Sequence, residues 1–132
     1  MKLQENKIQE EIEDKIIDWI TMNVSGRLIV TKSDKNPFGA NLVVNKKGDY
    51  KSEGLFLKVQ SQIGPDGAQK VSKDFLMEDF KINKNFYLLF AYFDTVRQRV
   101  SDFVWIVPST EFKDMADVVS SGEGKKFLRF ES

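Results

Sequence analysis

The chain has 132 residues and no formal net charge at pH 7, and 41% of its residues are hydrophobic and 30% charged. This composition is typical of a soluble globular protein, so we expect a single domain over residues 1–132. Cysteine and histidine are absent, which excludes disulfides, thiolate and imidazole metal sites, and every mechanism that uses a histidine base.

The first residues are polar, whereas a secretory signal needs an apolar core. The longest apolar run, residues 86–93, falls far short of the ~18 apolar residues that a membrane span requires. We therefore expect a cytoplasmic protein with no membrane partner.

An amphipathic helix is predicted over residues 4–23. Its large apolar residues recur at spacings of three and four and form one stripe: Ile8, Ile12, Ile16, Trp19 and Ile20. Acidic residues fall on the opposite side, so we expect the helix to pack on a sheet through this stripe.

Three strands are predicted next, at residues 27–31, 40–44 and 54–63, because each run is short, apolar and bounded by polar turns. Gly48-Asp49 lies between the second and third strands and is a hairpin signal. Because strand side chains alternate, Lys58 and Gln60 should share one face of the third strand. Successive strands of this kind favour antiparallel pairing.

The second half of the chain predicts a helix over residues 71–82 and strands at 85–94 and 102–107. Both strands are apolar on two faces, which is typical of internal strands in a covered sheet. A further helix with Ser109 as its N-cap is predicted from the apolar spacing in residues 112–119.

A last short strand is predicted at residues 127–130, after a glycine-containing loop. Strands separated by helices favour a mixed sheet, in contrast to the three early strands. We therefore expect an α/β fold with a central mixed β-sheet flanked by helices.

Polar residues open the second strand and recur on the third. Asn41 follows the turn at residues 36–39, and Lys58 and Gln60 follow on the next strand. This pattern, with one helix followed by three strands, resembles the restriction-endonuclease-like superfamily and its PD…(D/E)xK motif. The resemblance covers residues 8–130 and implies the restriction-endonuclease-like core.

Two later segments extend this resemblance, at residues 86–94 and 105–109. They are similar to a group of small bacterial proteins within the superfamily. The resemblance implies a nuclease, in which two acids hold a magnesium ion and a lysine stabilises charge at the phosphate.

The charged positions of the motif differ from the superfamily pattern. Asn41 stands in place of the aspartate, Lys58 in place of the second acid, and Gln60 in place of the lysine. Asn41 offers a metal one neutral oxygen, and Lys58 would repel a divalent cation. The sequence therefore predicts a catalytically degraded domain that binds nucleic acid or a protein partner.

Two alternatives stay open at this point. An active nuclease would need Mg²⁺ or Mn²⁺ and acids from elsewhere. Candidates are Glu53 and Asp49 before the third strand, and Glu11 and Glu13 on the first helix, from which some superfamily members contribute a glutamate. The other alternative is a purely protein-interaction domain. If the resemblance holds, Asn41, Lys58 and Gln60 should converge on one side of the sheet, with Lys58 in the metal position.

Overall fold

The computed structural model describes residues 2–23, 27–33, 35–48, 54–64 and 71–131; of residues 2–5, 23, 102 and 103 it describes the backbone alone. The elements in chain order are α1 (Lys2–Asn23), β1 (Leu28–Lys32), β2 (Leu42–Lys46), β3 (Leu55–Gly64), β4 (Ser72–Leu76), the 3₁₀ helix η1 (Met77–Asp79), β5 (Phe86–Asp94), β6 (Arg99–Pro108), α2 (Ser109–Met115), β7 (Asp117–Ser120) and β8 (Lys126–Glu131).

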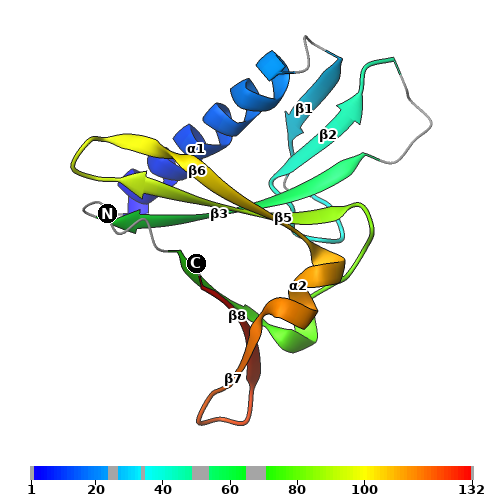
Figure 1. Cartoon of the computed structure of the whole chain (residues 1–132), viewed down its shortest axis with the longest axis vertical. Helices are drawn as coiled ribbons and strands as arrows, with labels where there is room; N and C mark the ends of the chain where they lie inside the picture. Colours follow the sequence, from blue (N-terminus) through cyan, green and yellow to red (C-terminus); the bar gives the residue numbers. More distant parts are fainter. Residues whose placement is uncertain (1, 24–26, 34, 49–53, 65–70, 132) are drawn as a thin grey trace.

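The strands form two sheets. The larger has five strands in the order β1-β2-β3-β5-β6, and the smaller has three in the order β4-β8-β7. β1, β2 and β3 pair antiparallel, β3 and β5 pair parallel, and β5 and β6 pair antiparallel. Figure 1 shows α1 on one side of the larger sheet, and α2 with the small sheet on the other. The expected α/β class and mixed sheet are confirmed.

The helix α1 covers one face of the larger sheet through its isoleucine stripe. Ile12 and Ile16 are 0% and 1% exposed and pack in one cluster with Leu57 and Val59 of β3 and Leu89 of β5. The spacing of four residues places these isoleucines on one side of the helix. The predicted helix and its packing face are confirmed.

A second core, rich in aromatic rings, fills the space on the opposite face. Phe90 of β5 stacks on Phe130 of β8 with ring centroids 3.9 Å apart, and Phe112 of α2 packs in the same cluster. Because Leu89 faces α1 while Phe90 faces these rings, β5 is buried on both sides. The prediction that this strand is internal is confirmed by its place between β3 and β6.

The predicted helix over residues 71–82 is wrong, because β4 and η1 occupy this segment. β4 pairs antiparallel with β8, and Asp74 lies directly opposite Arg129. Phe75 packs edge-on against Phe112 with centroids 5.4 Å apart. Pairing with a distant strand therefore overrides the local helical pattern.

Two further expectations need correction near the end of β6. β6 lies at the edge of the larger sheet and Ile106 is 57% exposed, so this strand is not internal. Ser109 does not cap α2: its hydroxyl donates to the Asn83 carbonyl at 2.8 Å and accepts the Asn83 N–H at 3.0 Å. The helix ends at Met115, and Val119 belongs to β7.

Candidate functional site

Asn41 binds the backbone on both sides of Lys58. Its N–H donates to the Leu57 carbonyl at 2.9 Å, and its Oδ1 accepts the Val59 N–H at 2.7 Å. The side chain thus replaces a backbone carbonyl and prolongs the pairing of β2 with β3 by one residue. Asn41 therefore lies beside the Lys58 backbone, and its carboxamide oxygen is engaged with the Val59 N–H. The convergence of the Asn41, Lys58 and Gln60 side chains on one face stays a prediction.

Lys58 lies on the face of β3 that points away from α1. Its Nζ is 5.6 Å from the centroid of the Phe75 ring, within the range of a cation–π contact. Gly39 has a φ of 68°, and a Cβ built on it would lie 3.7 Å from Lys58 Nζ. The turn before β2 therefore passes close to the ammonium group, in a conformation that favours glycine.

Lys58 lines a hollow of about 290 Å³, which we call the Lys58 hollow. It combines aromatic rings with charges of both signs. Its lining consists of Phe38, Phe75, Phe80, Phe86, Leu76, Lys58, Lys81, Asp74 and Asp79. The rings of Phe38 and Phe86 stack with centroids 5.1 Å apart, which gives the hollow an apolar wall.

Asp74 is paired with a cation from the neighbouring strand. The Arg129 guanidinium donates two hydrogen bonds to its carboxylate, at 2.8 and 3.0 Å. This hydrogen bonding, supported by the positive charge of Arg129, holds the pKa of Asp74 below its usual value. The pair leaves Lys58, Lys81 and Asp79 as the remaining charged groups of the hollow.

The other expected site residues are distributed over both faces of the sheet. Gln60 lies two positions after Lys58 on the same face of β3, opposite Phe90 of β5. Glu11 and Glu13 belong to α1, on the opposite face. Glu53, with Asp49, lies outside the described residues.

Glu13 belongs to a small network between α1 and β3. It is 9% exposed and accepts a hydrogen bond from Gln9 Nε2 at 3.0 Å. Gln9 also donates to the Val59 carbonyl at 3.2 Å and accepts from the Ser61 hydroxyl at 2.8 Å. Because this network lies on the α1 side of the sheet, Glu13 is separated from Lys58 by the sheet itself.

These groups do not favour a metal centre. Within the described ranges, no group of three or more acidic side chains could hold a metal ion. The two aspartates of the Lys58 hollow include one that is hydrogen-bonded to Arg129.

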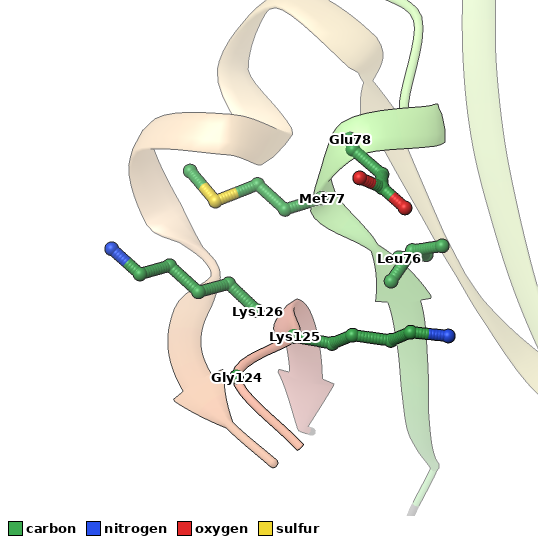
Figure 2. Close-up of a pocket in the computed structure, with 6 residues that line it drawn as sticks. All are labelled: Leu76, Met77, Glu78, Gly124, Lys125 and Lys126. Atoms are coloured by element: carbon green, nitrogen blue, oxygen red, sulfur yellow. The ribbon is translucent and has the colours of Figure 1, made fainter.

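A second hollow, of about 380 Å³, borders the first because Leu76 lines both. Met77 and Glu78 line it from one side, and the turn between β7 and β8 lines it from the other. Figure 2 shows the Lys125 and Lys126 side chains extending to opposite sides of that turn. Further cations thus lie next to the Lys58 hollow.

Sequence reasoning missed the part of the site that β4 and β8 supply. Asp74, Phe75 and Lys81 fall in the segment assigned to a helix, so their position beside Lys58 could not be inferred. Arg129 is 55 positions away from Asp74 in the sequence, and no local sequence pattern predicts that ion pair.

Comparison with protein-family models, with curated proteins and with solved structures finds no match for this chain. Among the described residues, no helix has both the length and the apolar character needed to cross a membrane.

Proposed function

We propose that this chain is a restriction-endonuclease-like domain that binds single-stranded nucleic acid at the Lys58 hollow and does not cleave it. The observation that carries the proposal is the position of Lys58 beside an aromatic wall. Proteins that bind single strands combine cations for the phosphates with aromatic rings on which bases stack. One helix followed by three antiparallel strands supports the restriction-endonuclease-like class. The strand β4, which stands where we expected a helix over residues 71–82, departs from that expectation.

The loss of cleavage follows from the residues at the motif positions. Lys58 places a positive charge where an acid would hold the metal, and this charge repels a divalent cation. Asn41 Oδ1 is engaged with the Val59 N–H. Binding a metal through Asn41 would therefore weaken a hydrogen bond that holds β2 to β3.

The adjoining hollow extends the proposed surface beyond Lys58. Leu76 lines both hollows, and Lys58 and Lys81 line the first, while Lys125 and Lys126 line the second. Each phosphate neutralised by a lysine releases counterions into the solution. A tenfold rise in salt concentration therefore lowers the logarithm of the binding constant by about 0.7 for each such contact.

The test is fluorescence anisotropy with a labelled oligothymidine, repeated at several salt concentrations and with a duplex of the same length. Lys58→Met and Lys81→Met should each weaken single-strand binding and reduce the salt slope by about 0.7. Lys113→Met, which removes an exposed lysine outside both hollows, should change neither quantity. Equal affinities for all three variants would contradict the proposal.

An active metal-dependent nuclease is the second candidate. The observation in its favour is that Asp74 and Asp79 line the same hollow as Lys58. Titration calorimetry with Mn²⁺ and a plasmid-cleavage assay would distinguish the two. Metal-dependent cleavage that is abolished by Asp79→Asn or Glu53→Ala would overturn the binding-only proposal.

A further inference from the structure

The face of the larger sheet under α1 contains an apolar groove of about 480 Å³. It opens between the C-terminal half of α1, with Ile16, Trp19 and Ile20, and strands β1, β2, β3, β5 and β6. Every lining residue is apolar or aromatic, and the polar side-chain atoms among them are the Tyr87 hydroxyl oxygen and the Trp19 indole nitrogen. Leu55 and Ile106, which border it, remain 41% and 57% exposed.

Two lysines lie next to this groove. Lys46 pairs directly with Leu28 and follows Val44 on the same face of β2, so it lies on the groove side of the sheet beside Leu28, at the β1–β2 end. Lys15 Nζ lies 5.2 Å from the centroid of the Trp19 ring. Within the described part of the chain, neither lysine forms an ion pair, whereas Lys32 is bound to Asp14 at 2.9 Å. Lys15 Nζ donates a hydrogen bond to the Val100 carbonyl at 3.4 Å.

These features restrict the occupant. The volume lies within the ~300–1,000 Å³ usual for small-ligand sites. A peptide segment would lose water from its amides in a lining whose polar side-chain groups are the Tyr87 hydroxyl and the Trp19 indole N–H. These two groups are too few to pair with every amide, and each unpaired amide costs free energy. A hydrocarbon chain has no such groups, and a negatively charged head would be attracted by Lys46 at the groove end.

We propose that this groove binds a free long-chain fatty acid, with its hydrocarbon chain against the sheet and its carboxylate beside Lys46. The proposal is independent of nucleic-acid binding, because the groove and the Lys58 hollow lie on opposite faces of the larger sheet.

The two tryptophans provide matched reporters. Trp19 lines the groove, whereas Trp105 packs in the aromatic core on the other face. In Trp105→Phe, monomeric dibromostearate should quench the remaining fluorescence of Trp19 in a saturable way. In Trp19→Phe, the fluorescence of Trp105 should remain nearly unchanged. Equal quenching in the two variants, or none in either, would overturn the proposal.

Variants at the groove border test the position of chain and head, in the Trp105→Phe background. Ile106→Asp should abolish quenching, whereas Val118→Asp, at an equally exposed apolar position of β7 (54% against 57% exposed), should not. Lys46→Met should weaken binding of the acid roughly two- to fivefold, as expected for an exposed ion pair, and Lys47→Met should have no effect. The brominated alcohol should bind equally well to Lys46→Met and to the protein with Lys46.

Two other occupants of the groove would give different experimental results, and either result would overturn the proposal. Quenching by brominated phospholipid vesicles but not by the monomeric acid would assign the groove to a membrane surface. Dimerisation in sedimentation that is lost in Ile106→Asp, with no response to the acid, would assign it to a second copy of the chain.

Discussion

The Asn41 side chain takes the place of a backbone carbonyl in the pairing of two strands. A carboxamide oxygen can take the place of a backbone carbonyl in strand pairing, and Asn41 does so at Val59, a residue that is only 1% exposed. Aspartate has the same shape and would accept the same hydrogen bond, while adding a negative charge next to Lys58. The position is therefore compatible with either residue structurally, and the choice between them decides the charge of the site.

Substitutions at this position should separate structure from charge. Asn41→Leu leaves the Val59 N–H without an acceptor, so it should lower the free energy of unfolding by about 1–3 kcal/mol. Asn41→Asp keeps the acceptor and should cost much less. Urea unfolding followed by circular dichroism measures both values. Equal destabilisation by the two variants would show that the hydrogen bond at 2.7 Å contributes nothing measurable.

At the scale of elements, the sequence predicts those whose signal is local. The four-residue spacing of isoleucines is sufficient to predict α1, and an apolar run on both faces is sufficient for β5. The strand β4 differs, because its partner β8 begins 50 positions after β4 ends. Lys58 could be placed on a face by alternation alone, whereas the aspartates and rings around it depend on where β4 lies.

The packing of α1 can be tested with two isoleucines of different exposure. Ile12→Ala removes a fully buried side chain and should destabilise the protein by about 2–5 kcal/mol. Ile29→Ala, at a β1 position that is 45% exposed, should cost far less. Chemical denaturation of the two variants provides the comparison, and similar costs would mean that α1 is not docked as described.

The whole molecule consists of two cores that share one sheet. The α1 core and the aromatic core both contain residues of β5, with Leu89 and Phe93 in the first and Phe90 and Tyr92 in the second. Neither core can lose this strand and remain packed. The two layers should therefore be coupled during unfolding.

The single-tryptophan variants proposed above also test this coupling. Trp19 reports on the α1 side and Trp105 on the aromatic side. We expect each variant to show one transition in which its fluorescence and far-ultraviolet circular dichroism coincide, as for two-state unfolding. If fluorescence led circular dichroism in one variant and lagged it in the other, the two layers would unfold independently.

The long parallel pairing of β3 with β5 limits how the length of this chain can change. The two strands are aligned from Phe56 with Phe86 to Gly64 with Asp94. One residue inserted within β3 would move every later side chain to the opposite face. Inserted before Leu57, it would turn Leu57 toward the rings and Lys58 toward α1, damaging both cores and the Lys58 hollow together. Natural variants should therefore gain or lose residues between the strands, while the length of β3 stays constant.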